Sequence, residues 1–183
     1  MHIIIIGSST GGPRVLFDIF SDFPSIQAAI IIVQHMPLST TPRFAKRLSQ
    51  ICQLDVIIPK GGEHIKPKSL YIAPGDTHLI LRNNEEILLT STEKVNFVRP
   101  AIDVTMLTLT PDSRNQYTGI ILSGMGCDGA EGLLHMKSLG ATTVVQNPDS
   151  CTIKSMPEAA IRICDVDKII NPIEIRSFLL NQK

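Results

Sequence analysis

The sequence has no excess of charge and no long apolar run, and each absence excludes a class of protein. Seventeen basic and seventeen acidic residues cancel, so no overall charge attracts nucleic acid or an anionic membrane. The longest apolar run, 28–33, is far shorter than the roughly 20 residues of a membrane-spanning helix. The run 3–6 has no basic flank and leads into glycines, which argues against a signal peptide. We therefore expect a cytoplasmic protein that neither binds nucleic acid nor inserts into a membrane.

Cysteine is also scarce, and its spacing excludes a metal site. Cys52, Cys127, Cys151 and Cys164 show no paired spacing of metal ligands. A chain of 183 residues with 43% apolar residues can fill a core without disulfides. We expect free thiols, no metal and no cofactor, and we interpret Cys127 as a small turn residue. No repeat or low-complexity segment is present, which predicts a single domain over residues 1–183.

The chain opens with four consecutive isoleucines, residues 3–6, followed by a glycine-rich turn at 7–12. A β-branched run that ends in glycine is typical of a strand buried on both faces at the centre of a parallel sheet. Pro13 suits the first turn of a helix, because its missing N–H costs nothing there. A strand, a turn and a helix in this order place Ser9 at the carboxyl edge of the sheet, where open α/β folds bind ligands.

Two further strand ends carry polar residues of interest. The apolar run 28–33 ends at His35, and a right-handed βαβ unit brings His35 to the same edge as Ser9. A later strand, 119–122, ends in a second glycine-rich turn that contains Asp128. The sequence therefore predicts a serine, a histidine and an aspartate at one edge of a parallel sheet.

The rest of the chain predicts the fold class. A hairpin turns at Asn83 and Asn84, which both tolerate positive φ. Further strands are expected at 56–58, 70–72, 78–81, 86–89, 142–145 and 168–170, and further helices at 101–108, 157–163 and 173–180. We predict a three-layer, Rossmann-like α/β fold, with a mostly parallel, doubly wound sheet and an antiparallel hairpin insertion.

The first glycine turn is open to more than one interpretation. Gly7-x-Ser9-x-Gly11 matches the nucleophile elbow, in which small neighbours let a serine occupy a sharp turn. A phosphate- or nucleotide-binding loop is the alternative. A dinucleotide site is disfavoured, because the Gly-x-Gly-x-x-Gly spacing is missing and Gln34 and His35 occupy the place of a ribose-binding carboxylate. There is no Walker lysine.

His35 and Asp128 each have an ordinary structural interpretation, as a loop residue and as a helix N-cap. Their coincidence with Ser9 at three strand ends favours acyl transfer instead, because a serine needs a histidine to take its proton and a carboxylate to orient that histidine. An α/β-hydrolase assignment fails, since that fold has strands before the elbow and runs serine, acid, histidine.

Stretches around these residues resemble the catalytic domain of the chemotaxis protein-glutamate methylesterase (CheB) family. The nucleophile, histidine and aspartate motifs are IGSSTGG at 6–12, VQHMP at 33–37 and LSGMGCDGA at 122–130. Supporting stretches are YIAPGDTHL at 71–79, RPAIDV at 99–104 and SMPEAA at 155–160. The resemblance covers nearly the whole chain, with the motifs in the family's order.

The resemblance implies a serine hydrolase that removes methyl groups from glutamate γ-methyl esters on the cytoplasmic helices of chemoreceptors, and that often deamidates glutamines there. It implies Ser9 as the nucleophile, His35 as the general base and then acid, and Asp128 as the orienting carboxylate. The family places Thr10 and Met125 beside the reacting carbonyl, and we expect their backbone N–H groups to be the oxyanion donors.

The resemblance also bears on the partners and the regulation of the protein. The family usually has a phosphorylated receiver domain before the catalytic domain, whereas here the first strand begins at residue 2, so we expect no receiver domain in this chain. A separate receiver domain is a candidate partner, beside methylated receptor helices. Arg43, Lys46 and Arg47 form a solvated face or contact an acidic receptor helix. A non-catalytic receptor-binding domain of the same fold and an esterase for another methyl ester stay open as alternatives.

Overall fold

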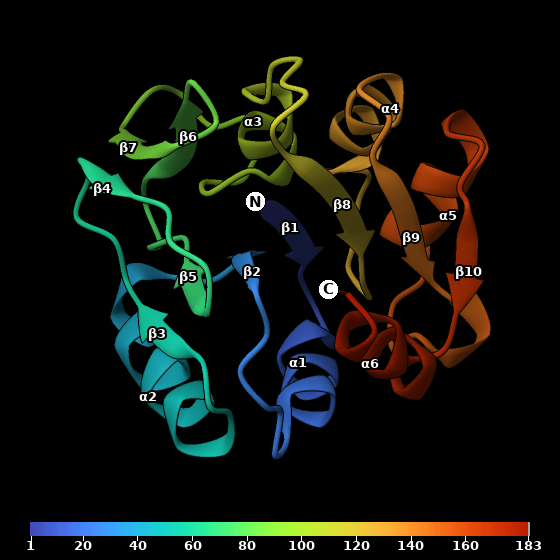
Figure 1. Ribbon diagram of the computed structural model, residues 1–183. Helices are drawn as coiled ribbons and strands as arrows, with labels where there is room; N and C mark the ends of the chain where they lie inside the picture. Colours follow the sequence, from blue (N-terminus) through green and yellow to red (C-terminus); the bar gives the residue numbers. More distant parts are fainter. Residues whose placement is uncertain (183) are drawn as a thin grey trace.

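The computed structural model describes residues 1–182, whose central sheet has seven parallel strands (Figure 1). In spatial order the strands are β10 (Lys168–Ile170), β9 (Thr142–Gln146), β8 (Gln116–Ile121), β1 (His2–Ser8), β2 (Ala28–Gln34), β5 (Ser69–Ile72) and β3 (Asp55–Ile57). The first strand is the middle one, as its run of isoleucines predicts. Along the chain, β2 is added on one side of β1 and β8 on the other, so the winding direction switches at β1.

The isoleucines of β1 supply both halves of the core. Successive side chains of a strand point to opposite faces. Accordingly, Ile3 and Ile5 belong to one buried cluster and Ile4 and Ile6 to the other, and all four are fully buried. A strand with no polar face can lie only where helices cover both sides of the sheet.

Within residues 1–182, three α-helices cover each face of the sheet (Figure 1). The helices α1 (Gly12–Phe20), α2 (Thr41–Ile51) and α6 (Pro172–Leu180) pack on the face of Ile4 and Ile6. The helices α3 (Ile102–Leu107), α4 (Ala130–Ser138) and α5 (Ser155–Ile163) pack on the face of Ile3 and Ile5. The predicted three-layer, doubly wound α/β fold is confirmed. Two short 3-10 helices, η1 (Leu38–Thr40) and η2 (Pro148–Ser150), lie in loops.

A small antiparallel sheet, in the order β4 (Glu63–His64), β7 (Glu86–Thr90) and β6 (His78–Arg82), lies beside the main sheet. Its hairpin turns at Asn83 and Asn84, whose φ angles are 52° and 59°, as predicted. The sequence does not reveal β4, because two residues without an apolar side chain produce no recognisable pattern. Among the described residues, no helix combines the length and the apolar character needed to cross a bilayer.

Candidate active site

The turns that follow β1, β2 and β8 meet at the carboxyl edge of the sheet. Ser9 follows the last residue of β1, and His35 follows the last residue of β2. Asp128 lies seven residues after the end of β8, in the glycine-rich turn before α4. Since β1 lies between β2 and β8, the three residues surround the point where the winding direction switches.

The turn after β1 presents one of its two serines to solvent. Ser8 is fully buried, and its hydroxyl donates to Oε1 of Gln34 at 2.6 Å. Ser9 is partly exposed, and its hydroxyl has no hydrogen-bond partner among residues 1–182. Its backbone is held on both sides: the Ser9 N–H donates to the Ser123 carbonyl at 3.0 Å, and Nε2 of Gln34 donates to the Ser9 carbonyl at 3.1 Å. Of the two, Ser9 is therefore the serine whose oxygen can react.

Glycines allow the close approach of these turns. A Cβ on Gly12 would lie 2.6 Å from Cβ of Ser8. A Cβ on Gly124 would lie 2.8 Å from Cβ of Ser9 and 2.2 Å from the sulfur of Met156. Any side chain at these two positions would separate the β1 turn from its neighbours, because a hard-sphere overlap of this size must be relieved by movement.

His35 is held next to the β1 turn by its backbone and next to Asp128 by its ring. The His35 N–H donates to the Ser8 carbonyl at 3.0 Å, and Nε2 lies 2.7 Å from Oδ2 of Asp128. A carboxylate can only accept, so Nε2 carries a proton and Nδ1 of the neutral ring keeps its lone pair. Nδ1 has no hydrogen-bond partner among residues 1–182, so it is free to accept a proton.

The carboxylate of Asp128 receives four donors. Oδ2 accepts from Nε2 of His35 and from the Ile102 N–H at 2.6 Å. Oδ1 accepts from Nδ2 of Asn96 at 2.9 Å and from the Asp103 N–H at 3.1 Å. Burial alone would raise the pKa of Asp128, but the hydrogen bonds from His35, Ile102 and Asn96 hold this pKa below its ordinary value. Asp128 is therefore charged at neutral pH.

A second carboxyl group, Asp103, lies behind Asp128. Its Oδ1 accepts from the N–H groups of Gly129 and Gly132 at 2.9 and 2.7 Å, and its Oδ2 accepts from Nδ2 of Asn96 at 2.8 Å. Burial and the nearby charge of Asp128 raise the pKa of Asp103 to about 6. The interpretation of Asp128 as the helix cap is wrong, because Gly129 is the N-cap of α4 and Asp103 binds the first amides.

The predicted oxyanion donors lie on the two glycine turns. Thr10 is exposed, and the Met125 side chain is also exposed, so solvent reaches both turns at these positions. Their N–H groups have no acceptor among the described residues. The hydroxyl of Ser123 donates to the Thr10 carbonyl at 2.8 Å, which ties the two turns together. The two N–H groups are thus available to an added ligand.

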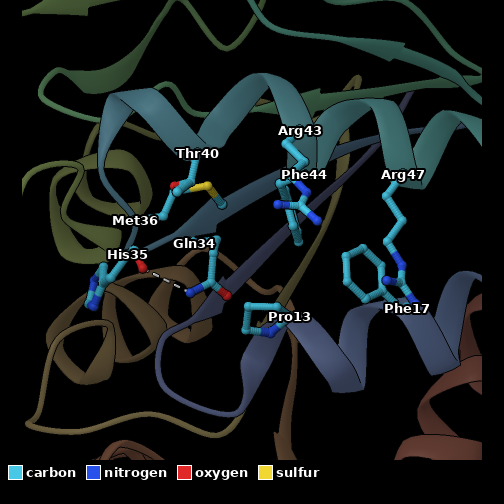
Figure 2. Close-up of a pocket in the computed structure, with 9 residues that line it drawn as sticks. All are labelled: Pro13, Phe17, Gln34, His35, Met36, Thr40, Arg43, Phe44 and Arg47. Carbon is cyan, nitrogen blue, oxygen red and sulfur yellow. Dashed lines mark hydrogen bonds between the residues drawn. The ribbon is translucent and has the colours of Figure 1, made fainter.

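Two hollows border His35 and Met36. Figure 2 shows the first, a groove of about 340 Å³ between α1 and α2, which we call the α1–α2 groove. It is lined by Pro13, Phe17, Gln34, His35, Met36, Thr40, Arg43, Phe44 and Arg47. The second, of about 310 Å³, we call the Phe97 hollow. It is lined by His35, Met36, Pro37, Asp76, Lys94, Phe97, Val98 and Arg99.

Three polar residues that organise the site are missed by sequence reasoning. Gln34 and Asp103 belong to the stretches VQHMP and RPAIDV, which assign them no role of their own, and Asn96 belongs to none of the motifs. Each of them also binds a partner at least 25 positions away in the sequence, which no local spacing identifies. A cluster of at least three His, Cys, Asp or Glu side chains suited to a metal is not found within residues 1–182.

Known proteins resemble this chain over nearly its whole length. The family model described as CheB methylesterase matches residues 4–179. A protein-glutamate methylesterase/protein-glutamine glutaminase of Syntrophus aciditrophicus is 40% identical over 172 residues, which cover 92% of this chain and 50% of that protein. One from Methanococcus maripaludis is 40% identical over 176 residues, covering 94% and 48%. The chain thus spans about half the length of these curated relatives.

A solved structure gives the same result. The crystal structure of the Thermotoga maritima CheB methylesterase catalytic domain superposes with a TM-score of 0.90 at 36% sequence identity. The match covers 97% of this chain and 96% of the other. With the family model and the curated relatives, this similarity shows that the chain belongs to the CheB methylesterase family.

Proposed function

We propose that the chain is a serine esterase that hydrolyses γ-methyl esters of glutamate residues in proteins. The observation that carries the proposal is the 2.7 Å hydrogen bond between His35 and Asp128, directly beside the turn that exposes Ser9. The names of the relatives, protein-glutamate methylesterase/protein-glutamine glutaminase, supply the substrate class.

In this mechanism, Oγ of Ser9 attacks the ester carbonyl while Nδ1 of His35 takes the hydroxyl proton. Asp128 stabilises the imidazolium that forms and holds the ring in the tautomer that exposes Nδ1. The tetrahedral intermediate collapses when His35 returns the proton to the departing methoxide, which leaves as methanol. The same base then activates water, which cleaves the glutamyl–Ser9 ester and leaves a free glutamate carboxylate.

The N–H groups of Thr10 and Met125 are the proposed donors to the oxyanion of the tetrahedral intermediate. Both N–H groups have no acceptor in the part of the chain that the structure describes, and both lie on the turns that Ser123 joins. Donors that are fixed before the reaction need no reorganisation as charge develops on the carbonyl oxygen. Deamidation of a glutamine would follow the same steps with ammonia as the leaving group.

The proposed substrates are the methylated cytoplasmic helices of chemoreceptors, which follows from the family. The proposed compartment is the cytoplasm, and a receiver domain is a proposed regulatory partner. The positive charge of Arg43 and Arg47 along the α1–α2 groove supports an acidic protein substrate, because neither side chain has an ion-pair partner among residues 1–182.

The direct test is methanol release from a methylated receptor by the purified protein, compared with Ser9→Ala. The variant should lose at least about 10⁴-fold in kcat, as expected for removal of a triad nucleophile. Cys127→Ala is the matched control, since this exposed thiol is adjacent to Asp128, and its activity should be unchanged. A serine-directed fluorophosphonate should label the peptide that contains Ser9.

Two results would contradict the proposal. If Ser9→Ala keeps substantial activity, Ser9 is not the nucleophile. If the wild-type protein binds the receptor and releases no methanol, the alternative of a non-catalytic receptor-binding domain is correct.

A further inference from the structure

A tight turn at residues 95–98 lies at the rim of the site. The Val95 N–H donates to the Val98 carbonyl at 3.2 Å, and the Val98 N–H donates to the Val95 carbonyl at 3.0 Å. The two central residues, Asn96 and Phe97, have φ angles of 52° and 66°. Positive φ at both central residues is typical of a type I′ turn, for which asparagine followed by glycine is strongly preferred.

Phe97 is an unfavourable residue for this position. The left-handed conformation crowds a bulky side chain, which is why glycine is preferred there. The side chain is also 95% exposed, so the aromatic ring gains nothing from burial within the described chain. Strained residues at a site of this kind often have a functional contact. The turn would fold more easily with glycine at position 97, and a contact of the ring with a molecule outside this chain would account for the phenylalanine.

The turn is fixed to the site by its other central residue. Nδ2 of Asn96 donates to Oδ1 of Asp128 and to Oδ2 of Asp103. The turn that carries Phe97 is thereby tied to Asp128. Phe97 also lines the hollow that His35 borders, so a molecule that reaches His35 from this side passes the ring.

We propose that Phe97 is a docking residue for the protein substrate, and that its ring packs on the apolar face of the acidic segment that carries the reacting glutamate. The proposal rests on the esterase function proposed above and extends it to substrate selection. An exposed aromatic side chain with few rotatable bonds suits such a contact, because little conformational entropy is lost when it is buried.

The charges around His35 specify an acidic occupant. Lys94 and Arg99 line the Phe97 hollow with a single carboxylate, Asp76, and Arg43 and Arg47 line the α1–α2 groove. Together, the two hollows are lined by four cationic side chains and one acidic side chain. A segment rich in glutamate matches this charge, which steers binding and fixes the register of the segment. The ring then supplies an apolar contact beside Lys94 and Arg99 in the Phe97 hollow.

The test compares Phe97→Gly with the wild-type protein on two substrates, a methylated receptor and a small soluble glutamate γ-methyl ester. Glycine is the preferred residue for this turn, so the variant should fold at least as well as the wild type. We expect kcat/KM on the receptor to fall about tenfold, mainly through KM, and activity on the small ester to stay unchanged. Phe97→Tyr, which keeps an aromatic ring at this position, should have the wild-type kcat/KM on the receptor.

Ile173→Ala is the matched control, because Ile173 is 69% exposed but lies on α6, outside the linings of both hollows. Its activity on both substrates should equal that of the wild type. Equal activity of Phe97→Gly and wild type on the receptor would overturn the proposal while leaving the esterase function intact. Loss of the small-ester activity in Ser9→Ala, measured in parallel, tests the esterase function separately.

Other binding partners of the Phe97 side chain would give different results. If Phe97 mediates contact between two copies of this chain, Phe97→Gly will lower the mass measured by sedimentation without changing kcat/KM on the receptor. If it contacts a receiver domain, the variant will change inhibition by that added domain alone. Either result would overturn the assignment to the substrate.

Discussion

The two edges of the central sheet each hold a largely buried histidine beside a hollow, but the two histidines have different partners. At the carboxyl edge, Nε2 of His35 donates to the Asp128 carboxylate at 2.7 Å. At the amino edge, Nε2 of His2 lies 2.9 Å from the hydroxyl of Thr118, and Nδ1 is buried without a hydrogen-bond partner among residues 1–182. The hollow at His2, about 340 Å³, is lined mainly by polar groups.

The two surroundings differ in the charge that lies next to the histidine ring. Burial and the nearby N-terminal ammonium lower the pKa of His2, so that ring stays neutral. Next to His35 lies the carboxylate of Asp128, which in the proposed mechanism stabilises the imidazolium formed during acyl transfer. A buried histidine and a hollow occur at both edges, so these two features alone do not identify a reactive site. The carboxylate partner and the free serine distinguish the carboxyl edge.

Asp128→Asn leaves His35, like His2, without a carboxylate partner. Of the substitutions compared between the two edges, it should have the largest effect. The asparagine is neutral and its nitrogen donates, so His35 loses the partner that stabilises its charged form. We expect kcat for methanol release to fall by about 10³- to 10⁴-fold, with little change in KM. Asp112→Asn, which removes a surface carboxylate paired with Arg114, serves as the control and should keep full activity. Retention of a substantial part of kcat by Asp128→Asn would mean that Asp128 does not assist His35.

Asn96→Ala removes one hydrogen bond from the Asp128 carboxylate and leaves the charge of that carboxylate in place. Oδ1 of Asp128 keeps only the Asp103 N–H, and no neutral amide then separates the two carboxyl groups. Because Asn96 is exposed and water replaces part of its contribution, we expect kcat to fall roughly tenfold.

The pH dependence of this loss tests the cause. The pKa of Asp103 is about 6 in the wild type, and loss of the Asn96 hydrogen bond raises it, so only well above pH 6 does the variant hold two adjacent charged carboxylates. Below it, protonated Asp103 can donate a hydrogen bond and relieve the repulsion. The ratio of wild-type to variant kcat should therefore be larger at about pH 8 than at about pH 5.5. A ratio that does not depend on pH would indicate a purely structural role for Asn96.

His2→Gln changes the amino edge and should have the smallest effect. The glutamine amide can still reach Thr118, so we expect unchanged kcat and a loss of less than about 1 kcal/mol in the free energy of unfolding. The lowered pKa of His2 means that the folded protein binds fewer protons than the unfolded chain below the ordinary value of 6.5. Wild-type stability therefore falls as pH drops below 6.5, and His2→Gln should lack this component. Chemical denaturation across pH 5 to 8 would measure it, and parallel curves for the two proteins would contradict it.

The fold was largely predictable because its signals are local. The isoleucines of β1 predict a central buried strand, and Asn83 and Asn84 predict the hairpin turn. Each of these patterns depends on a few consecutive residues and on rules for positive φ or β-branched side chains. The strand β4 lacks any such pattern and was missed.

The site was predictable only in part. Strand order and turn composition are sufficient to bring Ser9, His35 and Asp128 to one edge, and the roles of these residues and of Thr10 and Met125 stay predictions. Asn96 binds a carboxylate 32 positions further along the chain, from a loop with no regular pattern. Contacts of this kind depend on the final packing of α3 against α4, which no short stretch of sequence records.

The position of Asp128 in the chain also has a consequence for folding. His35 and its carboxylate partner are 93 positions apart, and the strand before Asp128 must pair with β1 before the two can meet. The pairing of β1 with β2 involves a much shorter loop and can form earlier, since closing a longer loop costs more entropy. During synthesis, the proposed hydrolytic activity should therefore arise only after residue 128 has emerged, and in refolding experiments the recovery of activity would report when β8 pairs with β1.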